Sequence, residues 1–331
     1  MKTAFLAFTD KGLALAKRLA SQLGGSAERC GGEITLTSWT HQHFKQGNAL
    51  VFVGAAGIAV RAIAPYCRSK ALDPAVVVVD ECAHFAVPLL SGHLGGANNL
   101  ARKIASVCGA VSVITTATDA NGVFAVDEWA KQQGCAVAEI ERIKHVSGKL
   151  LAGESIKMQS NWAVQGTAPN GVVLASAGDE PDFCLTVHSD DTQALHIVPH
   201  IGVLGVGCRR GVAVQQLEEA FAAFIKNHRL FAQCITCAAS IDLKQDEAGL
   251  LEFCANHGWD VSFYSAEQLK SVQGQFTPSN FVQNVTGVDN VCERAAVLKS
   301  KGELAVRKQA GGGVTFALAL MPFLPKWSDD E

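Results

Sequence analysis

Several features that mark other classes of protein are missing from this chain of 331 residues. No apolar run reaches the roughly 18 residues that a membrane helix needs, and the N-terminus lacks the pattern of a signal peptide. The net charge is −3 and no basic run is longer than Arg209-Arg210, so the charge pattern does not favour nucleic acid. The sequence therefore predicts a cytoplasmic protein with neither a membrane nor a nucleic-acid partner.

The cysteines also lack the arrangement of a zinc site or a disulfide framework. Eleven of them are scattered at irregular spacing, as is typical of reduced and mostly buried thiols in a cytoplasmic protein. Cys234 and Cys237 form the one Cys-x-x-Cys motif, and no second pair follows at zinc spacing. We therefore expect no metal site, with a redox pair at these two positions as the weaker alternative.

Strand and helix patterns alternate along the chain and predict an α/β fold. Hydrophobic residues make up 48% of the chain and charged residues 18%, a normal balance for a globular protein. Continuous apolar strands are expected over 3–8, 49–53, 75–79 and 111–116. Strands without polar alternation are typical of parallel sheets that helices cover on both faces.

The length of the chain predicts two or three domains. We predict two α/β/α-type units with mainly parallel sheets, joined by a smaller middle module with short β-like runs. The predicted boundaries are 1–134 for the N-terminal α/β domain, 135–200 for the middle module and 201–331 for the C-terminal α/β domain.

The stretch from Ala75 to Leu100 holds the densest group of candidate catalytic residues. Two adjacent carboxylates follow an apolar run, and a histidine lies in a glycine-rich loop: Asp80, Glu81, Ser91, Gly92, His93, Gly95 and Gly96. An imidazole titrates near neutral pH, so we predict that His93 activates water as a general base or acid, oriented by Asp80 or Glu81. The alternatives are Asp80 or Glu81 acting as catalytic groups themselves, Ser91 as a nucleophile, although Gly-x-Ser-x-Gly is missing, and a purely structural loop.

A second glycine-rich loop follows the strand predicted over 201–206. It contains Gly207-Cys208-Arg209-Arg210, and its glycine spacing differs from the Gly-x-Gly-x-x-Gly fingerprint of dinucleotide sites. Free N–H groups at a helix start and two guanidiniums favour a bound carboxylate or phosphate. The alternative is a packing loop with two solvated arginines.

Other loops are predicted to meet at the carboxyl edge of a sheet, where α/β proteins bind ligands. One strand precedes a small-residue turn with an arginine, and another ends in hydroxyls and a carboxylate. A further candidate, apart from these loops, is a lysine just before the last strand. These candidates are Gly54, Gly57, Arg61, Thr115, Thr116, Asp119 and Lys308. The alternatives are a well-packed turn at Gly54, a helix cap at Thr116 or Asp119, and a β-turn at Lys308.

Five blocks taken together resemble the cobalt-precorrin-5A hydrolase family of cobalamin biosynthesis. They are LLSGHLGGANNLA (89–101), VITTATDANGVFAVDEWA (113–130), GVLGVGCRRGV (202–212), IDLKQDEAGLLEF (241–253) and KQAGGGVTFALA (308–319). The likeness covers both outer thirds in the same order, whereas 135–200 offers no matching motif. The sequence departs from the family's pattern at Cys82-Ala83-His84, where a glycine usually follows the acidic pair.

The resemblance implies a hydrolase that opens the ring-A δ-lactone of cobalt-precorrin-5A and releases acetaldehyde, giving cobalt-precorrin-5B. His93 would supply the base, N–H groups near it would stabilise the oxyanion, and Asn98 and the arginines would hold a corrinoid rich in carboxylates. Because cobalt arrives inside the substrate, no cofactor is expected, and Cys208 is the nearest candidate for an axial ligand. Transient contacts with neighbouring pathway enzymes are also expected.

Two other functions stay open on the residues alone. A non-catalytic protein that escorts a tetrapyrrole between enzymes would need the arginines but not His93. A nicotinamide-dependent oxidoreductase would use the loop over 202–211, although its glycine spacing counts against this alternative.

Overall fold

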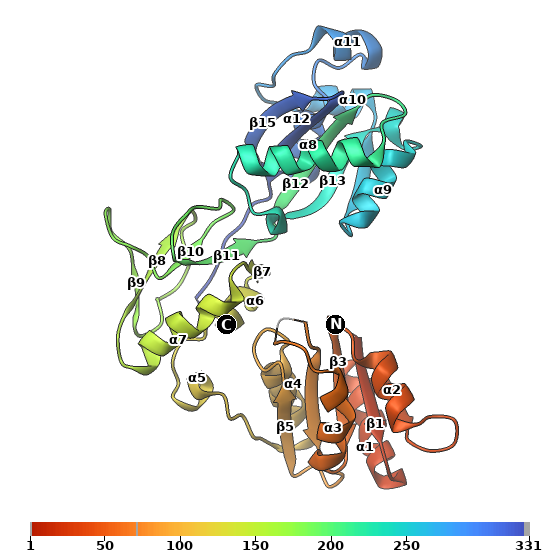
Figure 1. Ribbon diagram of the computed structural model, residues 1–331, viewed down its shortest axis with the longest axis vertical. Helices are drawn as coiled ribbons and strands as arrows, with labels where there is room; N and C mark the ends of the chain where they lie inside the picture. Colours follow the sequence, from red (N-terminus) through yellow and green to blue (C-terminus); the bar gives the residue numbers. More distant parts are fainter. Residues whose placement is uncertain (1, 71, 328–331) are drawn as a thin grey trace. The chain divides into compact units, whose positions relative to one another are not determined.

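The computed structural model describes residues 2–70 and 72–327 and contains three β-sheets (Figure 1). Residues up to Lys131 pack with 143–155 in one compact unit, and residues 132–142 pack with those from Ile156 onwards in a second. Among the described residues, no helix is long and apolar enough to span a membrane. The predicted α/β class with mainly parallel sheets is confirmed.

The first sheet has six strands in the order β2-β1-β3-β4-β5-β6. Their bounds are β1 (Lys2–Ala7), β2 (Ser26–Arg29), β3 (Asn48–Val53), β4 (Ala75–Val79), β5 (Phe85–Leu90) and β6 (Val111–Ser112). The first four run parallel, whereas β5 is antiparallel to β4, with Val79 opposite Ala86 and Val76 opposite Leu90. The loop that follows β5 therefore lies at the edge of the sheet where β4 begins.

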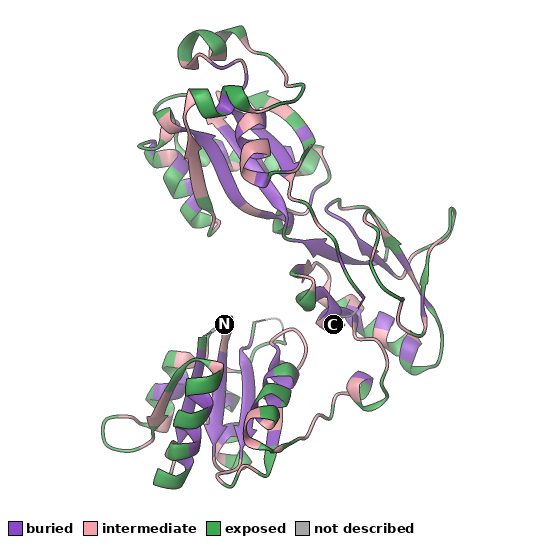
Figure 2. Ribbon diagram, turned by 180° about the vertical axis from the view of Figure 1, so that it is seen from behind, coloured by how far each residue is buried: buried purple, intermediate pink, exposed green. Residues whose placement is uncertain are grey.

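Helices cover both faces of this sheet, and its central strands β1, β3 and β4 are largely buried (Figure 2). Leu19 and Ile104 pack on one face, and Trp39 and Ile63 pack on the other. The helices on the first face are α1 (Asp10–Leu23) and α4 (Ala97–Cys108), and those on the second are α2 (Leu36–His43) and α3 (Ala56–Ile63).

Local side chains fix where helices of this unit begin. The hydroxyl of Thr9 accepts a hydrogen bond of 3.0 Å from the N–H of Gly12 and caps α1, an interaction worth about 1 kcal/mol. The remaining helical turns of this part of the chain are η1 (Ala64–Tyr66), α5 (Ala117–Ala120), α6 (Val126–Gln132) and α7 (Ile143–Leu151).

The second sheet has five short strands in the order β7-β11-β10-β8-β9. Their bounds are β7 (Cys135–Val137), β8 (Ile156–Ser160), β9 (Val172–Leu174), β10 (Phe183–Leu185) and β11 (Leu195–Pro199), with the turn η2 (Ile140–Arg142) between the first two. β7 is the antiparallel strand, and the other pairs are parallel. The side chains of Phe183 and Ile197 are fully buried.

The third sheet has the order β14-β13-β12-β16-β15. Its strands are β12 (Gly202–Cys208), β13 (Ile235–Ile241), β14 (Asp260–Tyr264), β15 (Glu303–Gly311) and β16 (Val314–Leu320). β12, β13 and β14 are parallel, and β16 is antiparallel to both of its neighbours. As a result, the loop after β12 and the β15–β16 hairpin lie at the same edge.

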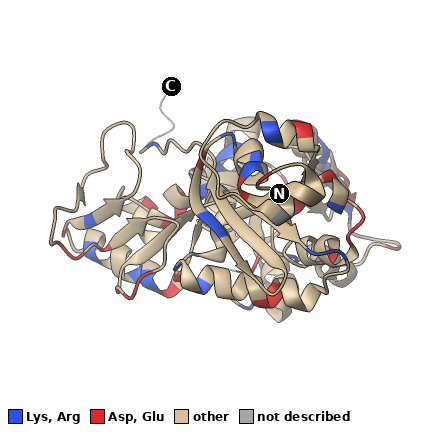
Figure 3. Cartoon of the chain, turned by 90° about the horizontal axis from the view of Figure 1, so that it is seen from above, with Lys and Arg blue, Asp and Glu red and all other residues tan. Residues whose placement is uncertain are grey.

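Helices also cover both faces of the third sheet. Phe224 and Phe253 pack on one face, and Leu269 and Ala295 pack on the other. The helical segments are α8 (Val214–Asn227), η3 (Ala232–Cys234), η4 (Asp242–Lys244), α9 (Ala248–Asn256), α10 (Ala266–Ser271), α11 (Asn280–Thr286) and α12 (Cys292–Ser300). Acidic and basic residues are interspersed along the described chain (Figure 3), in line with the small net charge of −3 of the full sequence.

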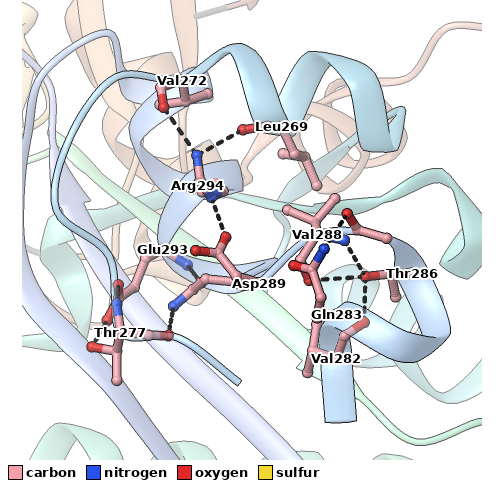
Figure 4. A network of polar contacts seen from close by, with 12 residues as sticks. Leu269, Val272, Thr277, Val282, Gln283, Thr286, Val288, Asp289, Glu293 and Arg294 are labelled. Carbon is pink, nitrogen blue, oxygen red and sulfur yellow. Dashed lines mark hydrogen bonds and ion pairs between the residues drawn. The ribbon is translucent and has the colours of Figure 1, made fainter. Parts of the chain in front are cut away.

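A buried carboxylate fixes the long connection before α12 (Figure 4). Glu293 is fully buried, and its oxygens accept hydrogen bonds of 2.7 and 2.8 Å from the N–H and hydroxyl of Thr277. Beside it, the guanidinium of Arg294 donates to Asp289 and to the carbonyl of Val272. The hydrogen bonds from Thr277 satisfy the carboxylate of Glu293, whose burial without partners would cost several kcal/mol.

Candidate functional site

The loop that carries His93 lies at the opposite edge of the first sheet from Asp80 and Glu81. Leu90, just before the loop, pairs with Val76 at the start of β4, whereas the two carboxylates follow the end of β4. The expectation that Asp80 or Glu81 orients His93 is therefore wrong. The reason is the reversed direction of β5, which carries the chain back across the sheet.

Two other carboxylates hold the His93 imidazole. Its Nδ1 lies 3.1 Å from Oδ1 of Asp127, and its Nε2 lies 2.8 Å from Oδ2 of Asp119. The side chains of His93 and Asp119 are 10% exposed and that of Asp127 is 6% exposed. We call these three residues the His93 cluster.

The charges of the cluster favour an imidazolium. Burial by itself lowers the pKa of the imidazole, but the hydrogen bonds and negative charges of Asp127 and Asp119 outweigh it and raise the pKa of His93 to about 9. At neutral pH both ring nitrogens therefore carry protons and donate to the two carboxylates. The group is a proton donor at rest, whereas the sequence favoured a base that activates water.

A second layer of polar groups positions Asp119. The amide of the buried Asn98 donates to Oδ2 of Asp119 at 3.1 Å and to the hydroxyl of Thr116 at 3.0 Å. Arg102 donates to the other oxygen of Asp119 and, over 3.2 Å, to Glu128. Burial raises the pKa of the Asp119 carboxyl, but His93 and Arg102 outweigh it, so that its pKa lies below the ordinary value.

Arg102 also bears on whether the cluster suits a metal. Ligand atoms of His93, Asp119 and Glu128 lie within 4.8 Å of one another, close enough to share an ion. The guanidinium of Arg102 already bridges the two carboxylates and offsets part of their negative charge. A divalent cation there would face this positive charge, so the arrangement fits an organic acid/base site better than a metal centre.

Glycines allow the His93 loop to fold tightly at the start of α4. A Cβ atom on Gly95 would lie 2.3 Å from Cβ of Ser91, and one on Gly96, whose φ is +88°, would lie 2.4 Å from Nζ of Lys131. The N–H groups of Ala97 and Asn98 close the loop by donating to the carbonyls of Ser91 and Gly92. The hydroxyl of the buried Ser91 donates to the carbonyl of Asp73, and not toward the imidazole.

The loops that were predicted to lie at one edge of this sheet lie at two different edges in the structure. Gly54 donates its N–H to Val79 and lies at the edge with Asp80, and Arg61 on the following helix donates to the carbonyl of Gly57. Thr116 and Asp119 lie with His93 instead, and the exposed Thr115 precedes them in the same segment. The expectation that all these loops share the carboxyl edge of the sheet is therefore wrong.

The arginine loop of the C-terminal sheet is fixed by its own neighbours. The N–H of Arg209 donates to the carbonyl of Gly313, and the exposed guanidinium of Arg210 pairs with Asp246 at 2.9 Å. Burial raises the pKa of the Cys208 thiol to about 11. Metals bind the thiolate, so Cys208 is a poor candidate for an axial ligand at neutral pH.

Two further candidates of this sheet have mainly structural contacts. A Cβ on Gly207 would lie 2.4 Å from the hydroxyl of Thr315, which donates to the carbonyl of Gly207. Lys308 lies inside β15 and not in a turn, and its N–H donates to the buried Glu293.

Three residues of the site were not selected from the sequence: Arg102, Asp127 and Glu128. Asp127 and Glu128 occur in the quoted block over 113–130, and Arg102 follows the block over 89–101 by one residue. An acidic pair in the first turn of a helix is ordinarily explained by the helix dipole, so sequence alone gave no reason to assign it a partner.

Comparisons with known proteins cover most of the chain. Three family models match in succession: Cobalamin synthesis G N-terminal at residues 38–119, Cobalamin biosynthesis central region at 124–197 and Cobalamin synthesis G C-terminus at 202–319. The cobalt-precorrin-5A hydrolase of Salmonella typhimurium is 32% identical over 96% of this chain and 97% of its own length. The enzyme of that name from Priestia megaterium is 32% identical over 85% of this chain and 80% of its own.

Among solved structures, a cobalamin biosynthesis protein G homolog from Sulfolobus solfataricus is similar along 97% of both chains. Its sequence identity is 20% and its TM-score is 0.41.

Proposed function

This chain belongs to the cobalt-precorrin-5A hydrolase family, and from that premise we propose that its His93 cluster carries out the proton transfers of the reaction. It is an enzyme of cobalamin biosynthesis with a small corrinoid substrate. The observation that carries the assignment of the site is the buried imidazole between Asp119 and Asp127, whose pKa of about 9 makes it a proton donor at neutral pH.

The reaction that we propose begins with lactone opening. Water adds to the ring-A lactone carbonyl of cobalt-precorrin-5A and gives up one proton to the solvent, and the carbon–oxygen bond breaks, so that the carbonyl carbon becomes a carboxylic acid and the other oxygen an alkoxide. His93 donates the proton from Nε2 to that alkoxide, which leaves as a hydroxyl group, while Asp127 holds Nδ1 in place. Donation by a positioned acid of this kind is worth about 10²- to 10⁴-fold in rate.

The second step releases acetaldehyde to give cobalt-precorrin-5B. Having given up its proton, the neutral imidazole accepts the proton of the new hydroxyl as the carbon–carbon bond breaks, and the macrocycle takes up the electron pair. The imidazolium is thereby restored. One group thus serves as the acid of the first step and the base of the second.

Backbone and arginine donors complete the proposed site. The N–H groups of Gly95 and Gly96, at the start of α4, are assigned to the developing oxyanion, and each such donor is worth about 3 kcal/mol. Arg102, whose side chain is 44% exposed, is assigned to a carboxylate arm of the corrinoid. Arg61 follows the loop at the other edge of this sheet, so it is not assigned to the substrate held by the His93 cluster.

We also propose that the protein acts in the cytoplasm and needs no resident cofactor for this reaction, because cobalt enters with the substrate. Transient contacts with neighbouring enzymes of the pathway stay a prediction.

The test is to incubate the protein anaerobically with cobalt-precorrin-5A and to assay for acetaldehyde. We expect the wild type and His41→Ala, which alters an exposed histidine on α2, to release it, and His93→Ala to lose it. Corrinoid binding without acetaldehyde from the wild type would favour the escort protein. Full activity of His93→Ala would remove the His93 cluster from the mechanism.

A further inference from the structure

The turn that joins β4 to β5 places three different metal-ligating side chains together, at the edge of the sheet away from His93. Ligand atoms of Asp80, Cys82 and His84 all lie within 4.8 Å of one another. We propose that this turn is a site for a divalent transition metal such as Zn²⁺ or Co²⁺, bound by the carboxylate, the thiolate and the imidazole. The proposal does not depend on the function assigned to the His93 cluster.

Backbone hydrogen bonds hold the turn in shape before any ion binds. The carboxylate of Asp80 accepts from the N–H of Cys82 at 2.9 Å and from that of Phe85 at 2.7 Å. The N–H of Ala83 donates to the carbonyl of Asp80, and Ala83 has a φ of +59°. Each carboxylate oxygen has a second lone pair for a metal, so these hydrogen bonds and metal binding are compatible.

The spacing of the ligand atoms suits tetrahedral coordination. Two ligands held 2.0–2.1 Å from zinc at the tetrahedral angle lie about 3.4 Å apart. Nδ1 of His84 lies 3.6 Å from Oδ1 of Asp80. Cys82 and His84 are exposed, so their side chains can move closer to a bound ion without disturbing the packed core. The exposed side of the turn leaves a fourth coordination position open.

The side chain of Lys11 also contacts the turn. Nζ of Lys11, on α1, lies 2.9 Å from Sγ of Cys82 and donates a hydrogen bond to it. Lys11 is exposed on a flexible stem and can withdraw into solvent when an ion takes its place.

The donor set selects the class of metal. A thiolate with an imidazole and one carboxylate matches zinc and similar borderline-soft ions, whereas Mg²⁺ and Ca²⁺ prefer sites made of oxygen ligands alone. The spacing of the cysteines does not indicate this site, because an Asp-x-Cys-x-His turn contains one cysteine and no Cys-x-x-Cys pair.

The test is a titration of the reduced full chain with Co²⁺, followed by its optical spectrum. We expect one equivalent to give a thiolate-to-cobalt charge-transfer band and visible bands of tetrahedral intensity. Cys82→Ser should abolish the charge-transfer band, His84→Ala should weaken binding at least tenfold, and Cys67→Ser, at another exposed cysteine, should behave as wild type.

A second titration, with cobinamide in place of free Co²⁺, distinguishes binding of the free ion from binding of cobalt that a corrinoid already holds. A macrocycle occupies four coordination positions of cobalt, so it cannot take all three protein ligands. Binding of free Co²⁺ that needs both Cys82 and His84 supports the proposal. The proposal is overturned if free Co²⁺ gives no charge-transfer band, if the band persists in Cys82→Ser, or if cobinamide binds the turn and free Co²⁺ does not.

Discussion

Nε2 of His93 lies 2.8 Å from Oδ2 of Asp119, a carboxylate 26 residues further along the chain. This contact, with that of Asp127 on the other ring nitrogen, converts a loop histidine into a buried imidazolium. This charge state and the loop that maintains it determine how activity and stability respond to pH and to substitution.

The activity should depend on pH through His93. If the protonated imidazole starts the reaction, kcat/KM for acetaldehyde release stays constant through neutral pH and falls as the pH rises through about 9, the pKa of His93. The measurement is a pH–rate profile with saturating and limiting substrate. An activity that instead increases up to pH 9 would mean that the neutral imidazole starts the reaction.

Asp127→Asn should move this alkaline limit to lower pH. The substitution removes a negative charge and its hydrogen-bonding carboxylate from Nδ1, so the pKa of His93 falls toward its ordinary value of 6.5. We expect the fall in kcat/KM to shift by at least one pH unit, with Asp10→Asn, at a highly exposed carboxylate, as the unshifted control. An unshifted limit in Asp127→Asn would assign the titration to another group.

The same pKa predicts how stability changes with pH. The pKa of His93 is raised from 6.5 to about 9, so its stabilising contribution is complete below about 6.5 and is lost as the pH rises through 9. The contribution at neutral pH is at most about 3 kcal/mol. Urea unfolding at pH 7 and pH 9.5 should show wild type losing stability relative to His93→Ala. If wild type and His93→Ala lose the same free energy of unfolding between pH 7 and pH 9.5, the ion pairs of His93 are contradicted.

Arg102→Gln should act mainly on substrate binding. The guanidinium bridges Asp119 and Glu128 and is partly exposed, and it is the group that we assign to a corrinoid carboxylate. We expect KM to rise about tenfold, equivalent to 1.4 kcal/mol, with a smaller change in kcat. Arg102→Lys should restore part of the loss. A large fall in kcat with an unchanged KM would indicate instead that Arg102 acts through Asp119.

Gly95→Ala should disturb the His93 loop. The added Cβ would lie 2.3 Å from Cβ of Ser91, so the backbone must shift, at a cost of about 1–3 kcal/mol. Gly148→Ala on α7 is the matched control, because nothing lies within 4 Å of its added Cβ, and it should be neutral or slightly stabilising. Thermal unfolding and acetaldehyde release measure both effects; equal stability of the two variants would contradict the tight loop.

The direction of β5 shows which part of the site was accessible to sequence reasoning. Residues 80–84 are the whole connection between β4 and β5, too short for the crossover that parallel strands need. The antiparallel pairing could therefore have been derived from this short connection. This pairing alone separates Asp80 from His93, because it carries the chain back to the other edge of the sheet.

The amino-acid sequence by itself determined the α/β class, the strands β1, β3 and β4 of the first sheet, the glycine-rich loops, the family and His93 as the central candidate, whereas it missed β2 and predicted β6 over 111–116 where the structure has Val111–Ser112. Those features are local, since apolar runs, glycines and short motifs act through neighbouring residues. Only the tertiary structure decided which carboxylates meet His93, because Asp119 and Asp127 reach it across 26 and 34 residues. The proton state of His93 follows from burial and those two charges, and neither is a property of the loop in which it occurs.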